Sequence, residues 1–564
     1  MTLEPCGPWN PGIESTVPRR LLPLVTLYRP ENVFGGLADA LELADLTGLE
    51  AEELVAFRPQ RLALHELLVR VTADLSVPDG PRVEDLGINF RAMTSTILAR
   101  YIAPHMAAIE RAYEALSRAV ASLAGAELAA AFARRVAPKD DAAHAERLLA
   151  GWETRASREN SEPARAALRA VARVVSAARV RHGRLWGDPA LLAPVATRLA
   201  CNEHGSVAIG RLIEPLVTEA ARSERFAVLP AQRQPVVMNT KGASASGKST
   251  MRPLQKALAG EIGVAWSDFA LISPDIWRKQ LLDYGSLGEA AKYAGSFTGQ
   301  ELRMIDQKLD RYMAAKAERG AMSHMLIDRF RFDSFAPASD EAGSNLLTRF
   351  GHFVYLFFMI TPPHATVERS WRRGLEVGRY KAVDDLLAHN VEAYGGMPEL
   401  FFTWALSGDK SVHYEFLDNG VPAGERPLTA AFGLNGELNV LDVKCMLDIE
   451  RYAKIDIGAT RPEQVYPGGE AAAPGSNTRF LAQCARRLPA LNFAERDTGR
   501  IYARIEAGAL AWTDPGPLGA ALADPETRAG VLAVAPGALE ARAHRSGQHL
   551  PAGRARTLGR WRAG

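Results

Sequence analysis

The stretch VVMNTKGASASGKSTMRPLQKALAG, residues 236–260, decides the fold class of this chain. Its first residues are mostly β-branched and apolar, as expected of a buried strand. A turn rich in glycine and serine follows, and the run after it has the composition of a helix. A strand, a tight turn and a helix in this order are typical of an α/β protein.

The turn fits the pattern G-x-x-x-x-G-K-[ST] of a phosphate-binding loop. The expected ATP-binding residues are Gly242, Ala243, Ser244, Ala245, Ser246, Gly247, Lys248, Ser249 and Thr250. Glycines let backbone N–H groups approach phosphate oxygens, and the following helix presents its positive end to them. Lys248 is expected to reach the β- and γ-phosphates, and the Ser249 hydroxyl to bind Mg²⁺. The alternative is a glycine–serine loop that matches by chance.

Composition excludes several classes of protein. The chain has 564 residues, of which 47% are hydrophobic and 23% charged, as in soluble globular proteins. Its formal net charge of +2 does not indicate a nucleic-acid or membrane surface. The 4 cysteines are too dispersed for a metal knuckle or a disulfide framework, which favours a reducing compartment. We see no signal peptide or membrane segment and expect a cytoplasmic protein; a leaderless secreted effector is the alternative.

Five β-rich runs alternate with helical stretches in the middle of the chain. The runs are 236–240, 269–273, 324–328, 353–361 and 412–418. Residues 299–318 repeat apolar side chains with a helical period. This alternation predicts parallel strands joined by crossover helices, with 353–360 as a central strand buried on both faces. We therefore expect an α/β P-loop NTPase fold in which helices flank a parallel sheet.

The remainder of the chain has a different composition. Alanine-rich helical patterns dominate the first part, a Pro/Gly-rich stretch lies near residue 470, and the end is rich in arginine. We predict a mainly helical region 1–234 of unassigned role, the α/β domain 235–456, a linker 457–477, a small mixed domain 478–540, and a basic, disordered tail 541–564.

Two carboxylates follow β-rich runs and are candidates for the acceptor side of a phosphoryl transfer. Asp275 stands just after the second run, where a carboxylate can orient and deprotonate a substrate hydroxyl. It could instead cap a helix. Asp328 ends the third run and is assigned to Mg²⁺ or to the substrate; pairing with a neighbouring arginine is the alternative.

Four arginines crowd one helix and the loop after it. They are Arg369, Arg372, Arg373 and Arg379. Guanidinium groups stabilise the negative charge that develops on a transferred phosphoryl group. The four positions cannot all face one way, so one or two are expected to reach the phosphates.

Taken in order, these motifs resemble the zeta-toxin family of P-loop kinases, over roughly a third of the chain. The resemblance implies transfer of the ATP γ-phosphate to a hydroxyl of a nucleotide-type metabolite, such as a UDP-amino sugar or NAD. It implies that Lys248, Asp275, Arg369 and Arg379 are catalytic. Arg278 belongs to the basic residues after Asp275 and is assigned with it to the substrate.

The pattern also departs from that family. Asp328 stands where the family usually has Glu, and the residues after Asp275 lack its His-Pro pair. The identity of the acceptor therefore stays open. The alternatives are a polynucleotide 5′-hydroxyl kinase, for which nucleic acid would be the partner, and a nucleotide-gated regulatory protein.

The helical region 1–234 has two interpretations. Zeta toxins are restrained by a small helical antitoxin, so a fused or separate helical inhibitor could cover the nucleotide site. A scaffold or an oligomerisation domain is the alternative.

Overall fold

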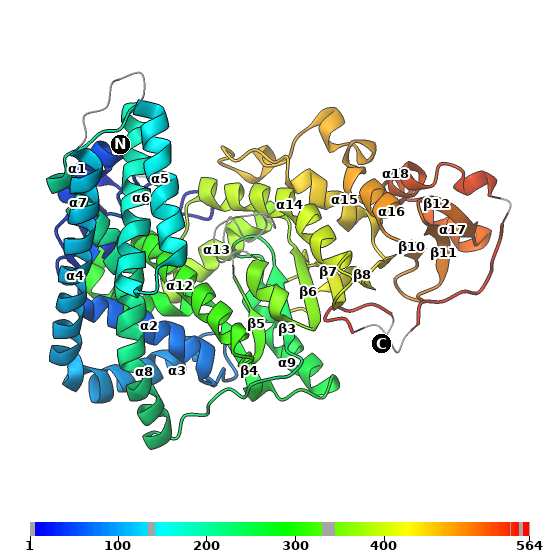
Figure 1. Cartoon of the computed structure of the whole chain (residues 1–564). Helices are drawn as coiled ribbons and strands as arrows, with labels where there is room; N and C mark the ends of the chain where they lie inside the picture. The colour runs from blue at the N-terminus through cyan, green and yellow to red at the C-terminus, as the bar shows by residue number, and fades with distance from the viewer. Residues whose placement is uncertain (1–5, 134–140, 330–344, 542, 552–555, 563–564) are drawn as a thin grey trace.

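The computed structural model describes residues 6–133, 141–329, 345–541, 543–551 and 556–562. It has an α/β fold built on a large mixed sheet, with a helical region at one end of the molecule (Figure 1).

The large sheet has ten strands in the order β12-β11-β10-β9-β8-β7-β6-β3-β5-β4. The strands are β3 Val236–Lys241, β4 Phe269–Ile272, β5 His324–Ile327, β6 Phe353–Ile360, β7 Ser411–Asp418, β8 Leu428–Leu434, β9 Glu437–Val440, β10 Ala490–Ala494, β11 Ile501–Glu506 and β12 Ala509–Thr513. Strands β4, β5, β3, β6 and β7 are mutually parallel. The five predicted β-rich runs are thus confirmed as parallel strands, and β6 is buried along all but its first residue.

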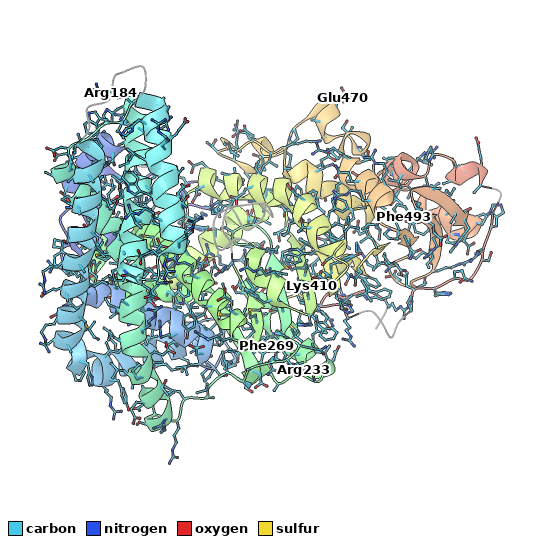
Figure 2. The ribbon with its side chains drawn as sticks, in the orientation of Figure 1. Arg184, Arg233, Phe269, Lys410, Glu470 and Phe493 are labelled. Atoms are coloured by element: carbon cyan, nitrogen blue, oxygen red, sulfur yellow. The ribbon has the colours of Figure 1, made fainter. Side chains whose placement is uncertain are left out.

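Helices connect and cover these strands. They are α9 Arg252–Glu261, α10 Arg278–Leu281, α11 Ala294–Phe297, α12 Gly299–Glu318, α13 Pro363–Val377, α14 Val383–Ala405, α15 Val443–Tyr452, α16 Arg479–Arg487, α17 Pro515–Ala521 and α18 Pro525–Val534. Helix α12 has the bounds that the apolar period predicts. Figure 2 labels Phe269 on β4, toward the helical region, and Phe493 on β10, toward the opposite end of the sheet.

The N-terminal region is mainly helical, as expected. Its elements are β1 Val33–Phe34, β2 Ala56–Phe57, α1 Leu37–Thr47, α2 Pro59–Asp74, α3 Asp85–Ile97, α4 Met106–Phe132, α5 Asp141–Arg158, α6 Glu162–His182, α7 Pro189–Ala200 and α8 Ser206–Ser223. Helices α4 to α7 enclose a core of their own, which includes Leu128, Trp152, Val171 and Leu192. One helical run, Asp85–Phe132, is long and apolar enough to cross a membrane by length and composition alone. The absence of a membrane segment stays a prediction.

Helix α2 joins the helical region to the sheet. It is buried on every side and packs against α8, α12 and β4. At this junction, which is shielded from water, the carboxylate of Glu301 on α12 accepts hydrogen bonds from Arg61 Nε (2.5 Å) and Nη2 (2.6 Å). One hydrophobic core contains residues from both parts. The boundary near residue 234 therefore separates two kinds of secondary structure, but one core crosses it, beside the separate core of α4 to α7.

The C-terminal part corrects two expectations. Strands β10, β11 and β12 do not form a separate small domain, because β10 pairs in parallel with β9 and extends the large sheet. The described residues of the tail are not disordered. The N–H groups of Leu558 and Gly559 donate to the buried carboxylate of Glu415, at 2.6 and 2.9 Å. Within 457–477, predicted as a linker, the structure has short 3₁₀ helices. The basic composition of the tail does not predict these contacts. They include isolated bridges of Arg560 with Leu428 on β8 and of His544 with Thr513 on β12.

Candidate active site

The carboxyl ends of the five parallel strands meet at one edge of the sheet. Strand β3 lies between β5 and β6, and the chain moves to opposite sides of β3 for β4 and for β6. In open α/β sheets, ligands bind outside the strand ends at such a reversal. The segments that follow these strands are therefore the candidates for ligand binding.

The loop 242–250 leaves β3 at this edge. Ala245 and Gly247 have positive φ angles, of 61° and 95°. A Cβ atom on Gly242 would lie 2.8 Å from Met359 Cβ, and one on Gly247 would lie 2.6 Å from Asn419 Nδ2. Both glycines are therefore required by close packing, and Gly247 also by its backbone conformation. A 3₁₀ turn, Lys248–Met251, leads directly into α9.

Neighbouring strands hold the loop in place. The carbonyl of Ser246 accepts hydrogen bonds from Thr361 Oγ1 (3.0 Å) and from Asn419 Nδ2 (2.7 Å). Thr361 directly follows β6, and Asn419 directly follows β7. Sequence reasoning missed both residues; their position just after a buried strand was the available signal.

The structure brings Ser249 and Asp328 together, as the shared Mg²⁺ assignment requires. Ser249 Oγ donates to Asp328 Oδ2 at 2.6 Å. Among the described residues there is no group of three or more His, Cys, Asp or Glu that could hold a metal. A hydroxyl and one carboxylate suit Mg²⁺, which usually keeps several waters and takes further ligands from phosphates.

Lys248 folds back onto the loop. Its ammonium group donates to the carbonyls of Gly242 (3.0 Å) and Ala243 (2.9 Å). Burial lowers the pKa of Lys248, against the opposing effect of the Asp328 and Asp275 carboxylates. Thr250 Oγ1 donates to the carbonyl of Gly247 at 2.6 Å. The predicted loop residues are thus gathered around one turn.

Asp275 lies in the 3₁₀ turn Pro274–Trp277 that follows β4. Its carboxylate accepts a hydrogen bond from Arg278 Nε at 2.9 Å and another from Arg379 Nη2. Burial raises the pKa of Asp275, but the two guanidinium groups outweigh it and hold the pKa well below its usual range. Its side chain is still 44% exposed. Asp275 is therefore a charged carboxylate that solvent and ligands can reach.

The four arginines lie in different environments, and their predicted contact with phosphates stays a prediction. Arg379 contacts Asp275, and Arg369 donates to the carbonyls of Asn419 (2.8 Å) and Val421 (3.0 Å). Arg373 lines the cavity in front of Asp275, whereas its neighbour Arg372 is exposed.

Arg373 has the environment of an anion ligand. Its Nε is buried and has no hydrogen-bond partner among the described residues. Burial, reinforced by the nearby charge of Arg379, lowers its pKa to about 9. A guanidinium group held in this way is stabilised by an anion that enters the cavity.

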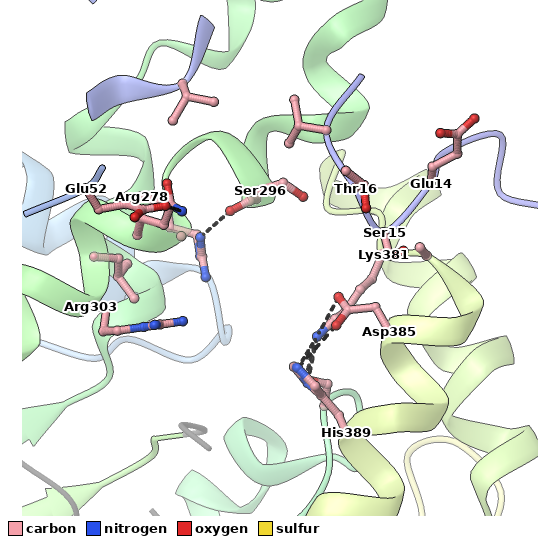
Figure 3. A pocket seen from close by; sticks show the side chains of 18 of the residues that line it. Glu14, Ser15, Thr16, Glu52, Arg278, Ser296, Arg303, Lys381, Asp385 and His389 are labelled. Atoms are coloured by element: carbon pink, nitrogen blue, oxygen red, sulfur yellow. Dashed lines mark hydrogen bonds and ion pairs between the residues drawn. The ribbon is translucent and has the colours of Figure 1, made fainter. Parts of the chain in front are cut away.

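Asp275 lines a cavity of about 1650 Å³. Figure 3 shows Arg278 and Arg303 on one side and Lys381, Asp385 and His389 on the other. Ser244 of the loop also lines it. The loop and Asp275 therefore open onto one space.

Lys381, Asp385 and His389 form a cluster that sequence reasoning missed. Lys381 Nζ lies 3.2 Å from Asp385 Oδ2 and 2.6 Å from His389 Nδ1. His389 Nδ1 in turn lies 2.8 Å from Ser244 Oγ. Burial lowers the pKa of Lys381 to about 8. Burial and the ammonium groups of Lys381 and Lys248 lower that of His389 to about 2, so the imidazole is neutral. Asp385 and His389 are four residues apart on α14, and this spacing was the signal for a shared helix face; Lys381 precedes the helix.

The N-terminal region forms the remaining wall of the cavity. Glu14, Thr16 and Glu52 line it (Figure 3). This wall is tied to the α/β part through Glu14 N, which donates to Tyr293 Oη at 3.1 Å, and through Thr26 Oγ1, which donates to the Phe297 carbonyl at 3.1 Å. The described part of the segment after Asp328 ends at residue 329 and begins again at residue 345.

Comparisons with known proteins give no assignment: no family model, no curated protein and no solved structure matches this chain.

Proposed function

We propose that this chain is a P-loop kinase of zeta-toxin type, which transfers the γ-phosphate of ATP to a hydroxyl group of a small nucleotide-type metabolite such as a UDP-amino sugar or NAD. The observation that carries the proposal is that Ser244 of the loop 242–250 and the charged carboxylate of Asp275 line one cavity. A loop for a phosphate donor beside a group that orients a hydroxyl is the arrangement that phosphoryl transfer needs.

The donor side is built from the loop. Its backbone N–H groups and Lys248 would hold the phosphates of ATP, and Ser249 and Asp328 would hold Mg²⁺. The residues fit these groups, because the loop has glycines at its closest approaches and the Ser249–Asp328 pair supplies oxygen ligands. When bound, ATP supplies the phosphoryl group and Mg²⁺ neutralises part of its charge.

The acceptor side depends on Asp275. Its lowered pKa keeps it ionised at neutral pH, so it can accept a hydrogen bond from a substrate hydroxyl. A carboxylate with a low pKa is a weak base, and we infer that Asp275 mainly orients the hydroxyl and accepts its proton late in the transfer. Arg373 then stabilises the negative charge of the transferred group.

The size and walls of the cavity support a reaction of two substrates. Its volume of about 1650 Å³ exceeds the 300–1,000 Å³ range of most single-ligand pockets. Because Glu14, Thr16 and Glu52 line it, we infer that the N-terminal region helps to bind the acceptor. This role is an addition to the two interpretations of that region, a helical inhibitor and a scaffold or oligomerisation domain.

Two variants of the full-length chain test the proposal. Lys248→Ala should lose most affinity for Mg·ATP, measured by calorimetry. Asp275→Asn should keep that affinity but lose about 10²–10⁴-fold of phosphoryl transfer to UDP-sugar or NAD acceptors. Binding of ATP without transfer to any acceptor, and indifference to Asp275→Asn, would favour a nucleotide-gated regulator instead.

A further inference from the structure

A second cavity lies between the helical region and α12, next to the candidate active site. Its volume is about 960 Å³. Glu50, Glu52, Gln300 and Arg303 line both cavities, so the two adjoin. We call the second one the basic cleft, after six of the residues that line it: Arg165, Arg169, Arg173, Arg303, Lys308 and Arg311.

The cationic side chains of the basic cleft are arranged in two rows. Arg165, Arg169 and Arg173 are spaced four residues apart on α6 and share one face of that helix. Arg303 and Arg311 are spaced eight residues apart on α12 and also share a face. Like charges four residues apart, as on α6, destabilise a helix, and the cationic rows that line one cavity repel each other. Stability alone does not explain this arrangement.

Most of these charges are not neutralised by neighbouring carboxylates. Within the described part of the chain, Arg165, Arg169, Arg303 and Arg311 have no carboxylate at ion-pair distance. Seven cationic groups and five carboxylates line the cleft. The ion pairs Arg173–Glu53 and Arg211–Glu162 remove two of each. Five cationic groups then face three carboxylates, so the cleft retains an excess of positive charge.

One cationic group of the cleft, that of Lys308, is buried. Lys308 is 6% exposed, and its Nζ donates to Ser206 Oγ at 2.8 Å. Burial lowers the pKa of Lys308 to about 8, against the opposing effect of the nearby carboxylates of Glu66 and Glu301. An ammonium group with a pKa lowered by burial is stabilised when an anion binds beside it.

We propose that the basic cleft binds a small polyphosphate anion, independently of the proposed kinase reaction. Guanidinium groups on facing helices match phosphate oxygens, which they bind through paired hydrogen bonds. The volume of the cleft lies within the range of small-molecule sites. The chain's formal net charge of +2 offers no general basic surface for a long nucleic acid strand.

The probe is inorganic tripolyphosphate, titrated into the full-length chain without Mg²⁺ at low salt. Because the loop 242–250 could also bind it, all proteins carry Lys248→Ala. The parent should bind tripolyphosphate. Adding Arg165→Ser and Arg169→Ser should weaken binding by roughly 10- to 100-fold for each arginine, the value of a hydrogen bond to a charged group. Arg311→Ser, on the facing helix, should act in the same direction.

A matched control removes the same charge from another helix. Arg111 and Arg118 are exposed on α4 and do not line the cleft, so Arg111→Ser with Arg118→Ser should leave the affinity unchanged. Equal affinity of the parent and the Arg165/Arg169 variant would overturn the proposal. It would also be overturned if the parent bound a single-stranded oligonucleotide, with steep salt dependence, but not tripolyphosphate.

Discussion

Replacing Arg373 by Met should stabilise the free protein and abolish its proposed activity. A pKa lowered from 12.5 to about 9 measures a penalty on the charged form of roughly 5 kcal/mol, at 1.36 kcal/mol per pKa unit. The folded pKa lies below the unfolded one, so this penalty is fully present below pH about 9 and declines as pH rises from there toward 12.5. It is therefore fully present at pH 7.

Part of that penalty comes from Arg379 and part of the Arg373 side chain contributes packing, so the net gain is smaller. Replacing buried ion pairs by apolar side chains of similar size is neutral or gains up to about 4 kcal/mol, and we expect a gain in the lower part of that range here. We expect a melting temperature a few degrees above wild type at pH 7. Phosphoryl transfer should fall about 10³–10⁵-fold, as when an arginine that stabilises the transition state is lost.

Thermal melting and phosphoryl transfer are measured on the same preparations. The control is Arg372→Met, which removes an equal charge from the exposed neighbouring position and should change neither property. A lower melting temperature for Arg373→Met, or full transfer activity, would refute the reasoning that Arg373 is held for an anion.

Three further results are expected. Ser249→Ala removes the hydroxyl that donates to Asp328, and should weaken ATP binding roughly 10- to 100-fold in Mg²⁺ but not in EDTA; equal losses in both would contradict the metal assignment. Lys381 Nζ lies 3.4 Å from Ser244 Oγ of the loop, so we expect its charge to contribute to ATP binding. ATP affinity should then fall as pH rises through about 8, where Lys381 loses its charge, and Lys381→Arg should remove this dependence in calorimetry. Burial raises the pKa of Glu415 to about 7, so its contribution to stability is fully present below pH about 4.5 and is lost as pH rises through 7. Melting temperatures between pH 5 and 8.5 should show that loss in wild type and a flatter profile in Glu415→Gln.

The central strands were predictable because their signal is local. Apolar runs of four to eight residues separated by helical stretches identify buried parallel strands, and β3 to β7 follow that pattern. The extension of the sheet by β10 to β12 was not predictable. Their pairing joins β9 to β10 across about fifty residues, and nothing in either strand's sequence specifies its neighbour.

Site residues that belong to a sequence motif or follow a strand could be predicted from the sequence. Site residues that are far apart in the sequence and meet only in the folded chain could not. The loop 242–250 and Asp328 directly follow a strand, and Asp275 lies in the turn just after β4, so strand ends place them. Arg373, Lys381 and His389 come together only because α13 and α14 pack beside the loop. The cavity-lining residues between positions 14 and 52 are more than 200 positions from Asp275 in the sequence. No local sequence pattern could predict that they line the same cavity.

The central claim is that the chain transfers the γ-phosphate of ATP to a small-molecule hydroxyl held against Asp275. The most direct measurement incubates wild type and Asp275→Asn with γ-labelled ATP, Mg²⁺ and a panel of UDP-sugars and NAD, and follows the label by chromatography. The account predicts label in an organic product with wild type, and about 10²–10⁴-fold less with Asp275→Asn. Label that remains in ATP or appears as inorganic phosphate alone, with every acceptor, would contradict it.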